Sequence, residues 1–353
     1  MAKDQGAALD RKKLMGDPIM VTTIVVLIAF LTLFILYPLA ILLVDSFVTD
    51  SGPSFEVFTR IFQMGSFTTA ITNTLAVGFL VSIVSALVGL LFAYVEVYVK
   101  LKTKFMSGLF QVVSMLPVVS PPFVLSLSII MLFGKSGLIT RYLLGMYDNS
   151  VYGFWGIFVV QTLTFFPVCY MMLKGLLKNI DPSLEEAARD MGASRWKVFT
   201  SVTLPLVLPG LGNAFLVTFI ESIADFANPM IIGGSYDTLA TTIYLQITGA
   251  YDKQGAAAMA VVLLCITLLM FVVQKYVLEA KSTATLSGKA SRARMLITDA
   301  SVRIPLTVIC CALAIFVVVM YLCVPFGALF KTWGYDFSLT TKWFEQVFTK
   351  YHG

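Results

Sequence analysis

Long apolar segments separated by short polar ones dominate this chain. A helix needs about 20 apolar residues to cross roughly 30 Å of hydrocarbon. Segments of that length are 19–44, 67–99, 106–133, 151–173, 202–228, 256–273 and 304–330. The pattern therefore predicts an all-α polytopic membrane protein with seven spans. The first span is too long for a signal peptide and lacks a small-residue cleavage site, so we expect it to be retained.

Lysine and arginine are distributed unequally over the connecting segments. One set of alternate segments contains 18 of these residues: the N-terminus, 99–106, 174–201 and 274–303. The other set contains 7: 45–66, 134–150, 229–255 and 331–353. Cytoplasmic loops of membrane proteins carry the excess of positive residues. The count predicts a cytoplasmic N-terminus and a C-terminal tail on the opposite side.

Composition excludes several classes of protein. The 353 residues are 58% hydrophobic and 13% charged, whereas soluble domains average about 25% charged residues. An ordinary cytosolic enzyme, a disordered protein and a secreted disulfide scaffold are therefore excluded. The net charge of +5 is explained by the lysine and arginine residues of the predicted cytoplasmic segments. Membrane lipid is therefore the expected surrounding, and nucleic acid is not an expected partner. The five cysteines lie in apolar runs and the one histidine is His352, so we predict no metal site and no catalytic residue.

Two spans contain features that a simple anchor does not need. Small residues recur at helical spacing in the second span and predict close packing against another helix: Thr74, Gly78, Ser82, Ser85, Gly89 and Ala93. Prolines interrupt the third span at Pro117, Pro121 and Pro122. Such breaks occur inside a bundle or beside a cavity, so this span is either a kinked packing element or part of a gate.

The last apolar segment resembles the first. Tyr37-Pro38-Leu39-Ala40 parallels Val324-Pro325-Phe326-Gly327, and residues 54–62 resemble 338–348. Internal repeats in transporters mark structural halves. We therefore expect a cytoplasmic N-terminus (1–17), a first half with six spans (18–277), a cytoplasmic linker (278–302) and the start of a second half with one span and an outer tail (303–353).

The predicted cytoplasmic segment 181–196 contains a short amphipathic helix. Asp181-Pro182 is typical of a helix start, and Gly192 is typical of a helix stop. An apolar face is predicted at spacings of three and four residues, formed by Leu184, Ala187, Ala188 and Met191. Glu185 and Arg189 could pair on the other side, and Ser194 could cap a second short helix. A helix of this kind suits the docking of a soluble partner.

The same segment has a characteristic spacing: Glu186-Ala187-Ala188, three residues, Gly192, nine residues, Val202, one residue, Leu204-Pro205. This spacing resembles the EAA loop of permease subunits in binding-protein-dependent ABC importers. That family usually has isoleucine where Val202 stands. The resemblance covers roughly residues 60–280, with the EAA loop at about 179–205. It implies the transmembrane domain of a type I ABC importer: a six-helix half followed by the first helix of a second half.

The resemblance also implies roles and partners. Glu186 would provide the polar contact to a cytoplasmic ABC ATPase dimer, Ala187 and Ala188 would pack closely, and Gly192 would make the turn; Leu204 and Pro205 complete the motif. ATP and Mg would bind the separate ATPase and not this chain. A periplasmic or lipid-anchored binding protein would deliver substrate. The second permease half would come from the same polypeptide, a homodimer or a paralogue in the bacterial inner membrane.

No nucleotide-binding loop is predicted in the chain itself. The phosphate loop requires a glycine five residues before its Gly-Lys-Ser. The one such tripeptide, Gly134-Lys135-Ser136, has Ile129 in that place. We therefore expect a non-catalytic subunit that depends on ATP hydrolysis elsewhere.

The fifth span is the most polar and is the candidate for the translocation path. Its polar residues are Asn213, Glu221, Asp225 and Asn228. Carboxylates inside a membrane should face the bundle interior or water. Glu221 and Asp225 could line the path, Glu221 could instead make a buried structural hydrogen bond, and Asp225 could be solvated near the outer surface. Glu96, at the inner end of the second span, is interpreted as interfacial.

The segment from Ala224 to Gly234, followed by Thr241-Thr242-Ile243-Tyr244, most resembles the ferric-iron branch, whose members include fused permeases. Ferric iron is therefore the expected substrate. Polyamine, thiamine, sulfate and aminoethylphosphonate remain alternatives. A secondary transporter would also explain broken helices and repeats but would leave the docking helix unexplained. An intramembrane enzyme using Glu221 and Asp225 lacks a third catalytic group.

Overall fold

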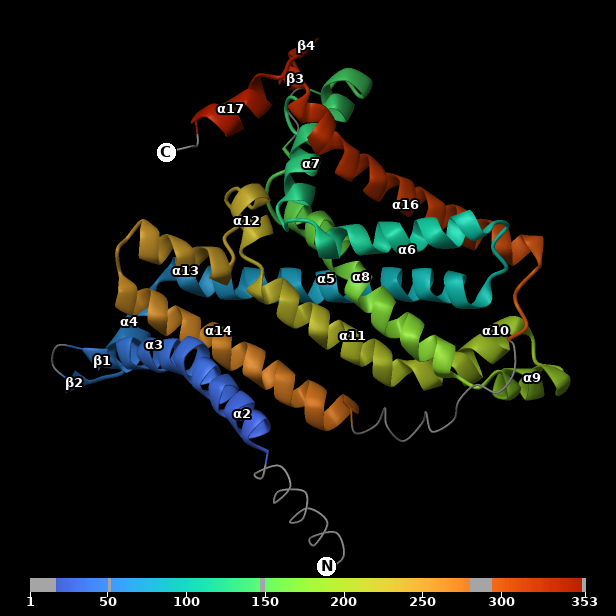
Figure 1. Cartoon of the computed structure of the whole chain (residues 1–353), viewed down its shortest axis with the longest axis horizontal. Helices are drawn as coiled ribbons and strands as arrows, with labels where there is room; N and C mark the ends of the chain where they lie inside the picture. Colours follow the sequence, from blue (N-terminus) through green and yellow to red (C-terminus); the bar gives the residue numbers. More distant parts are fainter. Residues whose placement is uncertain (1–16, 50–51, 147–149, 280–293, 351–353) are drawn as a thin grey trace, which may run out of the picture. The chain divides into compact units, whose positions relative to one another are not determined.

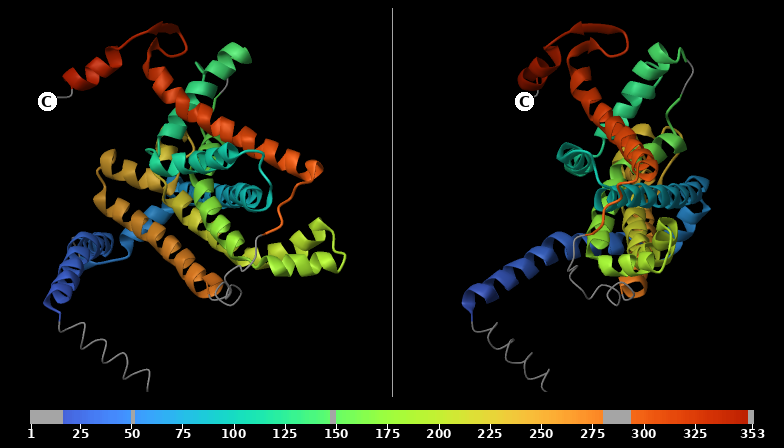
Figure 2. Two further views of the ribbon diagram at one scale, coloured as in Figure 1. Left: turned by 45° about the vertical axis from the view of Figure 1, so that its right-hand side comes forward. Right: turned by 90° about the vertical axis from the view of Figure 1, so that its right-hand side faces the viewer.

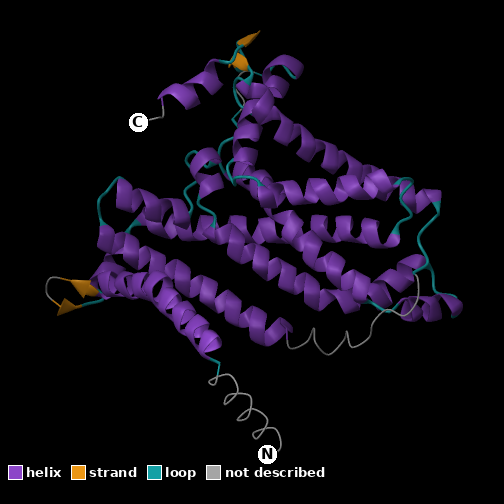
Figure 3. Cartoon of the chain, viewed as in Figure 1, coloured by secondary structure: helices purple, strands orange, loops and turns teal. Residues whose placement is uncertain are grey.

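The computed structural model describes residues 17–49, 52–146, 150–279 and 294–350. Within these ranges the chain is almost entirely helical, with strands only in two short hairpins (Figure 3). Most of the basic N-terminus, part of the predicted linker (280–293) and His352 lie outside the described residues. Contacts divide the chain into one unit of Met1–Met64 with Ile243–Val262 and another of Gly65–Thr242 with Leu263–Gly353.

The described part of the first unit begins with the helices α2 (Pro18–Leu31) and α3 (Tyr37–Phe47), joined by a π-helical segment (Thr32–Leu36). Together they form a 30-residue apolar span. Asp17 caps α2 by accepting a hydrogen bond from the Ile19 amide. Strands β1 (Val48–Thr49) and β2 (Gly52–Pro53) and helix α4 (Glu56–Gln63) follow.

Helices α5 (Gly65–Tyr98), α8 (Phe154–Asn179) and α11 (Leu204–Ala224) pack on one another in the core of the second unit (Figure 1). The six small residues predicted to form a packing stripe on α5 are all buried, which confirms that interpretation. At Gly89 the backbone of α5 approaches α8 so closely that an added Cβ would lie 2.6 Å from Cys169 Cβ.

Gly89→Ala is expected to lower the free energy of unfolding by about 1–3 kcal/mol, because the new methyl group overlaps α8. Gly175→Ala in α8 is the matched control, since a Cβ there meets no atom within 4 Å. It should stabilise the helix by up to about 1 kcal/mol through propensity alone. Denaturant unfolding of both variants in nanodiscs measures the difference. Equal effects would contradict the close approach of α5 and α8.

The predicted proline break in the third span, 106–133, is confirmed, although the bounds of the span differ. The segment forms two helices, α6 (Lys104–Val119) and α7 (Val124–Phe133), because Pro121 and Pro122 cannot supply backbone donors at the break. Helix α6 is shorter than a span, and the third span-length helical segment is Val124–Leu143, which ends in a π-helical segment (Leu138–Leu143). Seven span-length segments are nevertheless present among the described residues.

Helix α16 (Ala300–Ala328) packs against α6 and α7 (Figure 2). The hydroxyls of Ser120 and Tyr321 lie 2.7 Å apart at the break between α6 and α7. The Ser128 hydroxyl of α7 donates to the Met320 carbonyl of α16 at 2.7 Å. The two polar contacts tie the break to the last apolar helix.

The remaining elements of the described residues are as follows. They are helices α9 (Pro182–Asp190), α10 (Arg195–Val198), α12 (Ala227–Ile232), α13 (Leu239–Thr248) and α14 (Lys253–Val273), π-helical segments Phe199–Thr203 and Gln274–Glu279, strands β3 (Phe330–Thr332) and β4 (Asp336–Leu339), and helix α17 (Lys342–Lys350). The order of long helix, antiparallel hairpin and short helix thus occurs twice, as α2–α3, β1–β2, α4 and as α16, β3–β4, α17. This order matches the sequence repeat.

Candidate functional site

The local signals of the predicted cytoplasmic loop determine its helix ends. Asp181 caps α9 by accepting a hydrogen bond from the Ser183 amide at 3.0 Å, and Pro182 is the first helical residue. The chain leaves α9 through Gly192, whose φ of +85° favours glycine. Ser194 caps α10 through the Lys197 amide. These four predictions are confirmed.

The second helix of the loop is longer than predicted. Helix α10 continues through Phe199–Thr203 into α11, so that the fifth span runs from Arg195 to Ala224. The expected span of 202–228 therefore starts too late and ends too late. Leu204 begins α11, and the exposed Pro205 lies in its first turn, directly after the π-helical segment; proline is tolerated in a first turn because its missing N–H costs no regular helical bond there. A continuous helical segment thus joins the loop to the core helices of the second unit.

The apolar face expected on α9 divides between two environments. Ala188 is buried, whereas Leu184 is 50% and Met191 83% exposed. Ala187 is also exposed. On α10, Trp196 is 73% exposed. We call the exposed residues Leu184, Ala187, Met191 and Trp196 the apolar set of the loop; such side chains outside the core mark an interaction surface when they gather in one segment.

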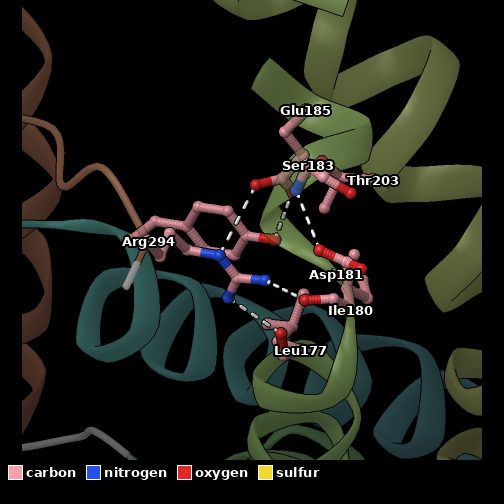
Figure 4. Close-up of polar contacts among 8 residues, drawn as sticks. Leu177, Ile180, Asp181, Ser183, Glu185, Thr203 and Arg294 are labelled. Atoms are coloured by element: carbon pink, nitrogen blue, oxygen red, sulfur yellow. Dashed lines mark hydrogen bonds and ion pairs between the residues drawn. The ribbon is translucent and has the colours of Figure 1, made fainter. Parts of the chain in front are cut away.

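Glu185 is the buried acid of α9 (Figure 4). One of its carboxylate oxygens accepts hydrogen bonds from the Tyr98 hydroxyl at 2.6 Å and from the Thr203 hydroxyl at 2.9 Å. The other lies 3.5 Å from Arg294 Nε. Glu185 pairs with Arg294 and not with the expected Arg189. Glu185 points into the core, whereas Arg189 lies on the exposed side of α9. Glu186 is half-buried.

Arg294 binds three structural elements at once. Its guanidinium donates to the Leu177 carbonyl at 2.9 Å and to the Ile180 carbonyl at 2.7 Å, both at the end of α8. It also lies 4.4 Å from the centre of the Tyr98 ring, at the end of α5. Together with Glu185, these contacts fix the base of α9 to α5 and α8 (Figure 4).

The partners of Glu185 have no distinctive pattern in the sequence. Tyr98 and Thr203 carried no signal, since each lies within an apolar segment that predicts only a helix. Arg294 was counted as a topology signal. The one usable indication in the sequence was the adjacent pair Glu185 and Glu186. Two neighbouring residues on a helix point in different directions, so only one of the two acids could face the ATPase and the other could face the core.

The polar residues of the fifth span do not form one cluster. Asp225 ends α11 and accepts hydrogen bonds from Gln161 at 2.9 Å and from both the amide and the side chain of Asn228. The buried Asn228 in turn accepts a hydrogen bond from Ser126 at 2.8 Å. These contacts join α7, α8, α11 and α12 and explain why the helix turns at Asp225.

Asn213, Glu221 and Glu96 have separate surroundings. Asn213 accepts a hydrogen bond from Gln274 at 2.7 Å. Glu221 is half-buried, and its Oε2 has no hydrogen-bond partner among the described residues. Glu96 pairs with Lys174 at 2.6 Å and accepts a hydrogen bond from Tyr170, so it links α5 to α8. Assignment of Asn213, Glu221, Asp225 and Asn228 to a translocation path remains a prediction.

Known proteins are similar to this chain in sequence and in fold. The chain is 34% identical over 342 residues to the "Ferric transport system permease protein FbpB" of Actinobacillus pleuropneumoniae, covering 96% of this chain and 49% of the relative. It is 33% identical to the "Putative ferric transport system permease protein FbpB 1" of Haemophilus influenzae, covering 96% and 54%. The chain spans about half the length of these curated relatives.

A solved structure has the same fold. It is a chain of a "bacterial alginate ABC transporter in complex with alginate pentasaccharide-bound periplasmic protein", with a TM-score of 0.63 and 17% identity, covering 77% of this chain and 97% of that chain. The family described as "Binding-protein-dependent transport system inner membrane component" matches residues 85–282, which include the whole loop. The chain therefore belongs to this family of inner-membrane transport components.

Proposed function

We propose that this chain forms a permease half of an ATP-driven ABC importer and that its substrate is ferric iron. The observation that carries the proposal is the match to two ferric transport permeases over 96% of the chain. The loop that contains α9 and α10 (181–198), which we call the docking loop, lies inside the family match. The chain would provide the translocation path and would not itself catalyse a reaction. A separate ATPase dimer would bind ATP and Mg.

The exposure pattern of the loop supports docking to that ATPase. Residues of the apolar set point away from the core, whereas Glu185 and Ala188 hold the helix from within. The half-buried Glu186 is available for a polar contact. The loop lies on the side that the lysine and arginine count predicts to be cytoplasmic. The opposite side would receive a binding protein.

The repeated order of elements supports a two-half organisation, with residues 303–353 starting the second half. Internal repeats are common in transporters and place the substrate path at the interface between repeats. A second permease half would therefore complete the pore.

ATP-dependent uptake tests the proposal directly. The complete transporter in proteoliposomes should import ferric iron only with ATP inside the cytoplasmic compartment and with its binding protein on the other side. Sulfate, thiamine, a polyamine and aminoethylphosphonate serve as competing substrates. Import of one of these in place of iron would overturn the substrate assignment, and uptake driven by an ion gradient without ATP would overturn the importer class.

A further inference from the structure

Residues 294–299 form a short extended segment that precedes α16, and we call it the strap. It lies between the part of the predicted linker outside the described residues and the helix that starts the second repeat. Three of its residues are attached to the first repeat, each by a different kind of contact. The strap therefore connects two parts of the chain that the repeat assigns to different halves.

The first attachment is Arg294, which binds Glu185 of α9 and the last carbonyls of α8. The second is Ile297, whose amide donates to the Tyr98 carbonyl at 2.7 Å and whose carbonyl accepts from the Lys100 amide at 3.1 Å. These two bonds form a parallel β-bridge with Val99. The third is Asp299, which precedes α16 and pairs with Arg195 of α10 at 2.9 Å.

The attachments reach both helices of the docking loop. Glu185 belongs to α9, Arg195 to α10, and the strap continues directly into α16. A displacement of the loop must therefore break these contacts or carry the start of α16 with it. Since Arg294 and Glu185 are both about nine-tenths buried, breaking their contact would leave unpaired charges in the interior, which is strongly unfavourable.

We infer that the strap positions the docking loop against the first helix of the second repeat, and that Arg294 is its positioning residue. This inference rests on the proposed function of the loop. Movement of the loop by an ATPase would pass to α16 through the strap as well as to α11 through the continuous helix. One docking loop would thus move helices of both repeats.

Arginine is required at this position for a geometric reason. Its planar group points two N–H donors at two carbonyls, faces a carboxylate and stacks on a ring. A lysine ammonium carries the same charge but lacks the planar arrangement of N–H donors. Arg294→Lys should therefore behave more like Arg294→Gln than like the wild type.

The ratio of iron transported to ATP hydrolysed tests the strap in the complete transporter. Arg294→Gln should lower this ratio about tenfold while ATP hydrolysis continues, because one buried charge loses its partner. Arg303→Gln is the matched control. It removes the same charge near the start of α16, and its side chain makes no hydrogen bond or ion pair within the described residues. An unchanged ratio in Arg294→Gln would overturn the inference.

A reversible cross-link separates positioning from folding. Val99→Cys and Ile297→Cys would occupy the two paired positions of the β-bridge, and a disulfide between them would fix the strap to the end of α5 without Arg294. In a cysteine-free background, oxidation of this pair should restore the ratio in Arg294→Gln, and reduction should abolish it again. If Arg294 serves folding alone, transport and hydrolysis should fall together and the cross-link should restore neither.

Hydrogen exchange tests the same contact without transport. Amides of α9 should exchange about tenfold faster in Arg294→Gln than in Arg303→Gln. Equal exchange would contradict the strap. A wild-type protein that fails to transport iron would overturn the proposed function, whereas this comparison would still decide whether the strap holds the loop.

Discussion

Glu185→Ala is expected to destabilise the docking loop by about 3–5 kcal/mol, because removing one partner leaves the other charge of a buried pair unpaired. The Arg294 guanidinium would remain in the interior, and the Tyr98 and Thr203 hydroxyls would lose their acceptor. The effect should appear as faster hydrogen exchange in α9 and a lower unfolding midpoint in nanodiscs.

Glu186→Ala is the matched control for this substitution. It removes the same side chain one residue later, where the carboxylate is half-buried and belongs to no ion pair among the described residues. Its effect on stability should stay within about 0.5 kcal/mol. Equal destabilisation by both variants would show that Glu185 does not hold the loop.

A negative charge at Ala187 is expected to uncouple transport without unfolding the protein. Ala187 is exposed beside other members of the apolar set, so Ala187→Asp would place an unpaired charge in the contact with the ATPase. Substitution of a central interface residue typically costs about 2 kcal/mol of binding free energy. This cost corresponds to roughly a 30-fold weaker affinity for the ATPase. Titration of the ATPase onto transporter in nanodiscs measures it.

Ala188→Asp provides the contrast. Ala188 is buried against the core, so a carboxylate there should lower the unfolding midpoint before it affects docking, because an unpaired buried charge is costly. If Ala188→Asp weakened ATPase binding and Ala187→Asp did not, then Ala188 and not Ala187 would lie on the face of α9 that contacts the ATPase.

Local signals predicted much of this molecule. Apolar length predicted span-length helices, the small-residue stripe predicted the close packing of α5, and Asp181, Pro182, Gly192 and Ser194 predicted the ends of the loop helices. Each of these depends on residues near one another in the sequence, where helix geometry alone decides the outcome.

Long-range contacts were not predictable in the same way. The choice of Arg294 over Arg189 as the partner of Glu185 depends on the contacts of residue 294 with α8 and α5, which are far from it in sequence. The end of the fifth span at Ala224 depends on Gln161 and Asn228, which bind Asp225 from other helices and from the next turn. Hydrophobic periodicity contains no information on either contact.

The most direct measurement of the central claim is a site-specific cross-link from the docking loop. A photoreactive probe on Met191→Cys, in a cysteine-free background of the complete transporter, should cross-link to the ATPase subunit. It should also react with an impermeant thiol reagent only from the cytoplasmic side. The same probe on Leu269→Cys, exposed on the membrane-spanning helix α14, should cross-link to lipid instead. Reaction of Met191→Cys from the outer side, or absence of any ATPase adduct, would contradict the account.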